Sequence, residues 1–158
     1  KPGTLKYLDE KRGFKNIILG ARIESIIDDL ELSTDSTDDD SDGITYYEVT
    51  NPDLKTVGED IVFKTFLVGV FDGRIARLAA TLDKPNGERL YETLKVAYGP
   101  GYKHNRFMDS YLWRTGFVLM GVDYDGLSED TFLMADREIQ KEIESYKKDR
   151  TLKAISDL

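Results

Sequence analysis

The chain has 158 residues, 40% hydrophobic and 33% charged, which suits one soluble domain with a core of its own. Its net charge of −8 repels phosphate backbones and anionic lipids, and so excludes nucleic acid and membrane surfaces as expected partners. With no cysteine, it lacks a disulfide framework, a thiolate nucleophile and a cysteine metal site.

The first 32 residues predict a loose arm followed by a helix. Residues 1–13 are polar and charged, with Leu5 and Leu8 as the only aliphatic side chains, and we expect them to form an edge segment or a frayed arm. Isoleucine and leucine then follow the i, i+3, i+4, i+7 spacing of an amphipathic helix over residues 21–32, at Ile23, Ile26, Ile27 and Leu30.

An acidic stretch, residues 33–42, contains no apolar side chain and is expected to be a solvated loop. Its alternative role is weak calcium binding, because Asp38, Asp40 and Asp42 alternate ahead of Gly43 and carboxylate oxygens are the ligands that Ca²⁺ prefers. The bidentate acid that closes a tight loop site is missing, since Val49 stands at that position. No other cofactor is expected.

The centre of the chain predicts a β-hairpin over residues 61–82, with Asp72-Gly73 as its two-residue turn. Pairing across this turn places Leu67 beside Leu78 and Phe63 beside Leu82 on a core face. The other face is expected to carry Val68 and polar side chains, namely Lys64, Arg77 and Thr81.

The second half predicts a helix that ends at Gly99-Pro100-Gly101, then three strands and a final helix. The strands are expected at residues 110–114, 117–124 and 130–134. Asp136 is expected to cap the last helix, with Ile139, Ile143 and Tyr146 on its inner side. The resulting order αβββαβββα is an α+β fold, an antiparallel sheet with helices on one face. One domain is expected over residues 14–148, with a frayed tail at 149–158 and Leu67, Leu78, Leu94 and Trp113 in one core.

A basic and aromatic stretch after the second helix is the candidate binding site. In this acidic protein, a loop of this composition can dock an acidic or aromatic group of a partner. The candidate residues are Tyr102, Lys103, His104, Arg106 and Phe107. The alternative is a flexible connection that only carries Tyr111 and Trp113 into the core.

Catalytic motifs are absent from the sequence: it has no nucleophile elbow, phosphate-binding loop, dinucleotide fingerprint or zinc-protease helix. Acid pairs such as Asp123 with Asp125 could serve a glycosidase, but acids are too frequent here for their spacing to be specific. No residue is therefore assigned a catalytic role.

Three stretches resemble small, mostly uncharacterised exported bacterial proteins. They are Phe14 to Gly20 with the helix predicted after it, Leu90 to Pro100, and Tyr111 to Tyr124 with its Trp-containing strand. The resemblance implies a fold akin to β-lactamase-inhibitor protein and small outer-membrane-assembly lipoproteins. It also implies a periplasmic or secreted protein, or a lipoprotein with a trimmed N-terminus. The sequence contains no run of the roughly 18 apolar residues that a membrane span needs.

We therefore expect a non-enzymatic, exported binding or scaffolding domain, whose partner is another protein or an envelope component. The alternatives are an envelope hydrolase that uses surface carboxylates, and a weak calcium-binding module.

Overall fold

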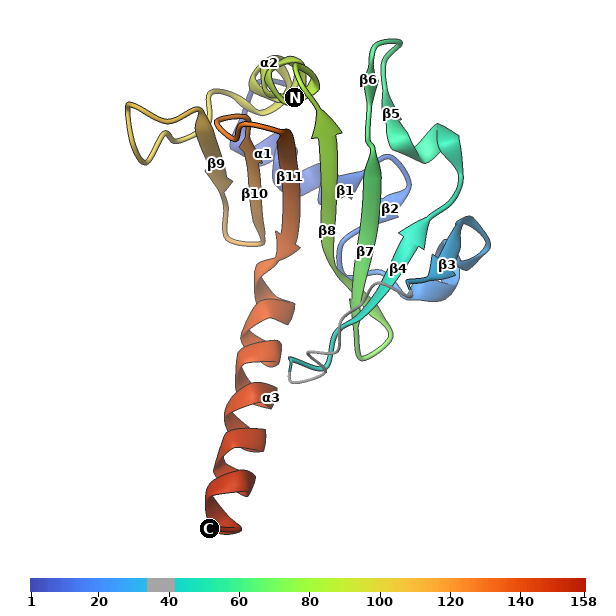
Figure 1. Ribbon diagram of the computed structural model, residues 1–158, viewed down its shortest axis with the longest axis vertical. Helices are drawn as coiled ribbons and strands as arrows, with labels where there is room; N and C mark the ends of the chain where they lie inside the picture. Colours follow the sequence, from blue (N-terminus) through green and yellow to red (C-terminus); the bar gives the residue numbers. More distant parts are fainter. Residues whose placement is uncertain (34–41) are drawn as a thin grey trace.

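A computed structural model describes residues 1–33 and 42–158. Its centre is a seven-stranded antiparallel sheet with the strand order β3-β4-β7-β8-β11-β10-β9 (Figure 1). The strands are β3 (Leu30–Leu32), β4 (Thr45–Val49), β7 (Thr65–Phe71), β8 (Arg74–Asp83), β9 (Ser110–Arg114), β10 (Val118–Asp123) and β11 (Glu129–Asp136). The predicted α+β class is confirmed, and so are the three strands of the second half.

One face of the sheet is covered by α1 (Leu5–Lys11) and α2 (Asn86–Tyr98). The two small hairpins, β1 (Gly13–Phe14) with β2 (Ile17–Ile18) and β5 (Thr56–Val57) with β6 (Ile61–Val62), complete this layer. The main core lies between the layers and includes Phe66, Leu78, Leu82, Leu90, Trp113, Met120 and Phe132. This arrangement leaves the opposite face of the sheet to be accounted for.

The helix α3 (Arg137–Ser156) starts at the end of β11, where the Asp136 side chain accepts a hydrogen bond from the Ile139 amide. Ile139 and Ile143 pack with Ile44 and Ala76 in a small second cluster at the end of β7 and β8. Beyond it α3 runs away from the sheet (Figure 1). The predicted cap and the inward positions of Ile139 and Ile143 are confirmed, whereas Tyr146 stays exposed with its ring 5.9 Å from that of Phe71. The helix continues through the residues predicted to fray.

The helix predicted over residues 21–32 is wrong. The segment forms two 3-10 turns, Ile23–Ser25 and Ile27–Asp29, and then enters β3. Ile23, Ile26 and Leu30 are still buried. The apolar spacing therefore identified side chains of the core but not the backbone conformation of the segment. Carboxylates crowd the C-terminal end of the segment, where a helix dipole disfavours them, and pairing of β3 with β4 satisfies the backbone instead.

The N-terminal residues form a helix instead of a frayed arm. The Thr4 hydroxyl accepts a hydrogen bond from the Tyr7 amide, and Leu8 is completely buried. The Tyr7 ring lies 5.7 Å from the Tyr98 ring of α2. One apolar turn is too short to display a helical period, so the sequence could not reveal this helix.

The central hairpin has the predicted turn and a different register. Asp72 and Gly73 both take positive φ values, 51° and 72°, as a two-residue turn of this type requires. A β-bulge between Gly69 and Val70 then shifts the pairing by one residue, so that Val68 faces Leu78 and Leu67 faces Ala79. Because a shift of one residue exchanges the faces of a strand, Val68 enters the core and Leu67 leaves it.

Candidate functional site

The face of the sheet opposite α1 and α2, here called the open face, carries a row of apolar residues. Strand registers place Leu112, Gly121, Leu133, Ala79 and Leu67 side by side on β9, β10, β11, β8 and β7. Tyr102 extends the row past β9, because its amide and carbonyl both hydrogen bond with those of Leu112. This set, from Tyr102 to Leu67, is called the apolar row.

Three members of the apolar row are exposed, whereas Leu67 and Ala79 are half-buried and Gly121 is buried. Tyr102 retains 66% of its exposure, Leu133 44% and Leu112 37%. On a half-covered antiparallel sheet the outer face normally carries polar side chains. A contiguous exposed apolar patch on such a face marks an interaction surface.

The strand sequences themselves suit a sheet that is covered on both faces. Residues 118–122 of β10 and 132–135 of β11 are uninterrupted apolar runs, the pattern of strands buried on two sides. In the described residues, 1–33 and 42–158, α1 and α2 cover one face of the sheet, whereas α3 covers only one end of the open face. This pattern is visible in the sequence, but the strand prediction made no use of it.

A cleft of about 390 Å³ lies where α3 meets the open face. Leu119 and Ala135 form its apolar part, and Arg114, Arg137 and Lys141 surround it together with Gln140 and Glu144. Neither Arg114 nor Lys141 has an ion pair among the described residues. This basic margin lies on one side of the apolar row.

A hollow of about 270 Å³ lies on the other side of the apolar row. It is lined by Asp123, Asp125 and Glu129 with Met108, Gly126 and Thr131. Glu129 also binds Lys64 at 3.0 Å, and Asp83 lies 3.8 Å from the same ammonium group. Carboxylates outnumber cations in this acidic margin.

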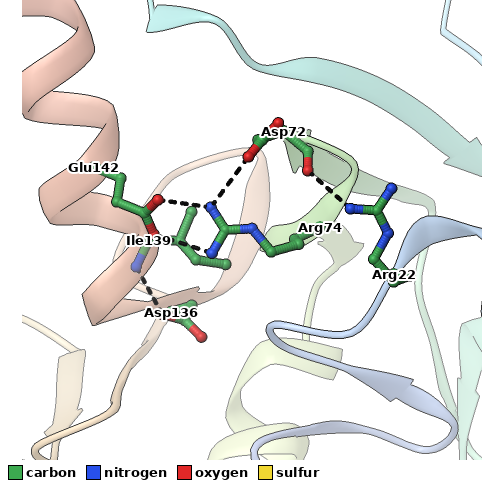
Figure 2. A network of polar contacts seen from close by, with 6 residues as sticks. All are labelled: Arg22, Asp72, Arg74, Asp136, Ile139 and Glu142. Carbon is green, nitrogen blue, oxygen red and sulfur yellow. Dashed lines mark hydrogen bonds and ion pairs between the residues drawn. The ribbon is translucent and has the colours of Figure 1, made fainter.

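Ion pairs hold α3, and with it one wall of the basic cleft, against the hairpin. Arg74 donates two hydrogen bonds to the Glu142 carboxylate, at 2.9 and 3.0 Å, and lies 4.0 Å from Asp72 (Figure 2). The hydrogen bonds from Arg74 lower the pKa of Glu142 below its ordinary value. Arg77 adds a contact of 2.7 Å to Gln140.

The edge of the sheet at β9 is supported from the core side by stacked aromatic rings. Tyr111 lies 3.8 Å from Tyr91 and 5.9 Å from Tyr124, measured between ring centroids. Burial, followed by the hydrogen bond with Tyr111, raises the pKa of Tyr124. The Trp113 indole donates to the Gly99 carbonyl at 2.8 Å. Tyr102 and Leu112 are therefore presented from a rigid edge.

The predicted binding loop is divided by the structure. Tyr102 belongs to the apolar row, with the His104 ring 6.5 Å away. Lys103 turns to the other side, toward Asp109 and the Tyr111 ring. Arg106 and Phe107 stack on each other in the exposed loop that follows. Only Tyr102 thus lies on the open face by its strand register.

Of the three predicted calcium ligands, Asp38 and Asp40 lie outside the described residues. Asp42 accepts a hydrogen bond from the Ile44 amide and lies 3.9 Å from Arg77. Within the described residues no cluster of three metal-ligating side chains occurs. The calcium prediction therefore gains no described ligand beyond Asp42.

Asp123 and Asp125 both accept hydrogen bonds from backbone amides, one in their own turn and one in the loop before β9. Asp123 accepts from the Asp125 amide at 2.9 Å, and Asp125 from the Asp109 amide at 3.1 Å. Such side chains order a turn. The hydrolase alternative therefore gains no support from this pair.

No helix of the described residues is long and apolar enough to span a membrane. Comparison of the chain with protein-family models, with curated proteins and with solved structures finds no match.

Proposed function

We propose that this protein is a non-enzymatic binding or scaffolding domain and that the open face of its sheet docks another protein. The observation that carries the proposal is the apolar row from Tyr102 to Leu67, which crosses five strands on the face opposite α1 and α2. Burying such a surface stabilises a complex by the same hydrophobic effect that forms a core.

The two-sided apolar strands support this proposal independently. Residues 118–122 and 132–135 suit strands with cover on both faces, and a docked protein would supply the second cover. The protein has an acidic and a basic margin beside the row. These margins would fix the orientation of a docked partner and favour partners of complementary charge.

Selection of random peptides displayed on phage tests whether the open face binds a partner. The selected peptides are then compared for binding to the wild-type protein and to a variant at Leu133, in the centre of the row. We expect peptides rich in apolar residues to bind the wild-type protein, and Leu133→Lys to weaken their binding by at least about tenfold, because a charge would have to be buried. The matched control is Val96→Lys, since Val96 is 74% exposed on α2, outside the open face.

Peptides that bind wild type and Leu133→Lys equally well would contradict the proposal. The expected location, periplasmic or secreted, is a further prediction, and immunoblotting of fractions from the source cells would check it.

A further inference from the structure

We infer that the protein docked on the open face is a second copy of this chain, related to the first by a two-fold axis along the apolar row. The inference rests on the proposed function, since it names the partner of the same surface. The symmetry of the two margins about the row carries it.

The margins occupy mirrored positions on the same two strands. On β10 and β11, Gly121 pairs with Leu133 in the apolar row. Two residues to one side, Leu119 pairs with Ala135, and both line the basic cleft. Two residues to the other side, Asp123 pairs with Thr131, and both line the acidic hollow.

A rotation of 180° about the row therefore sets opposite charges face to face. It turns the open faces toward each other and brings the basic cleft of one copy over the acidic hollow of the other. Glu129 at the start of β11 and Arg137 at the start of α3 lie equally far from Leu133 in sequence, so the rotation brings the ends that carry them together. The contact is isologous and forms two such charge matches at once.

The margins on β10 and β11 favour this axis over the perpendicular one. A two-fold axis parallel to the strands would place the acidic margin of one copy over the acidic margin of the other. Like charges brought together in this way cost affinity. With the axis along the row, the strands of the two sheets run almost aligned, as in packed β-sandwiches. Leu133 meets its symmetry mate, and the apolar strands gain their second cover.

Paired charge reversals test the axis. Variant A carries Arg114→Glu and Lys141→Glu in the basic margin, and variant B carries Asp83→Lys and Glu129→Lys in the acidic margin. Sedimentation velocity should show a wild-type dimer, and each variant alone should dissociate at least about tenfold more readily. An equimolar mixture of A and B should restore the dimer, because both margins of the mixed pair are again complementary.

A monomeric wild type would overturn the inference and leave the proposed function to be judged by the peptide selection. Dimers that survive in both variants, or a mixture that stays monomeric, would equally overturn it. Circular dichroism checks that A and B are folded.

A cross-linking measurement covers the case in which a charge variant does not fold. The chain has no cysteine, so Leu133→Cys places a single thiol next to the axis. A short bismaleimide should link two copies of Leu133→Cys and leave Val96→Cys unlinked at the same concentration. Equal cross-linking of the two variants would overturn the inference.

Discussion

Asp130 is the most completely buried acid of the described chain, and it shows how one residue fixes the entry to α2. Its side chain lies 2.6 Å from the Lys84 ammonium group and accepts a hydrogen bond from the Gly87 amide at 2.9 Å. A Cβ atom at position 87 would lie 2.4 Å from the Cβ of Asp130, so glycine is required by this close approach. The carboxylate thereby joins β11 to the first turn of α2.

Asp130→Asn is expected to lower the free energy of unfolding by roughly 1.5–3 kcal/mol, because it removes charge-assisted hydrogen bonds at a buried site. Urea unfolding followed by Trp113 fluorescence measures the change. The control is Asp28→Asn, an exposed acid, which should have little effect. Equal unfolding midpoints for the two variants would show that Asp130 does not hold the helix.

At the scale of elements, the attachment of α3 depends on one apolar cluster and one ion pair. Ile139 and Ile143 supply the cluster, and Arg74, at the end of the hairpin, donates two hydrogen bonds to the Glu142 carboxylate (Figure 2). The Arg74 and Glu142 side chains keep 26% and 50% of their exposure. Water and salt therefore screen the pair, and its contribution to stability is small.

Glu142→Gln should lower the stability of the protein by about 0.5 kcal/mol at neutral pH. The pKa of Glu142 is lower in the folded protein than its ordinary value of 4.5, so its contribution is present above that value and is lost as the pH falls through the folded pKa. Thermal unfolding midpoints of wild type and Glu142→Gln should thus differ at pH 7 and converge in acid. Asp149→Asn, an exposed acid on the same helix, is the control. A difference that persists below the folded pKa of Glu142 would contradict this mechanism.

For the molecule as a whole, the N-terminal segment is part of the domain. The main core is continuous from Leu8 of α1 through the sheet to Leu90 and Leu94 of α2. Loss of α1 would therefore uncover α2 and the strands beneath it, and unfolding should be a single transition.

Leu8→Ala is expected to cost roughly 2–5 kcal/mol, the range for deleting a buried leucine side chain. The matched control on the same helix is Leu5→Ala, because Leu5 is 45% exposed. Trp113 fluorescence and far-ultraviolet circular dichroism should report one shared transition in urea. A separate early transition in Leu8→Ala would show that α1 folds independently of the sheet.

Local chemistry was sufficient to predict several elements. The Asp72-Gly73 turn, the end of α2 at Gly99, the strand at Ser110–Arg114 and the Asp136 cap all follow from preferences of neighbouring residues, and the structure confirms them. Segments with a weak or misleading period were mispredicted. A single buried leucine defines α1, and the isoleucines of residues 23–30 are buried from 3-10 turns and a strand.

The candidate site depends on facts that no local pattern contains. The bulge beside Gly69 decides that Leu67 faces outward with Leu133, although the turn alone predicted it in the core with Leu78. The binding loop was predicted as one unit. The β-bridge between Tyr102 and Leu112 places Tyr102 on the open face and turns Lys103 to the other side of the sheet. The sequence by itself determined the elements that are bounded by specific turns and caps, because turns and caps are local. Only the tertiary structure decided which apolar side chains remain uncovered, because strand register and the placement of helices are set by contacts between distant segments.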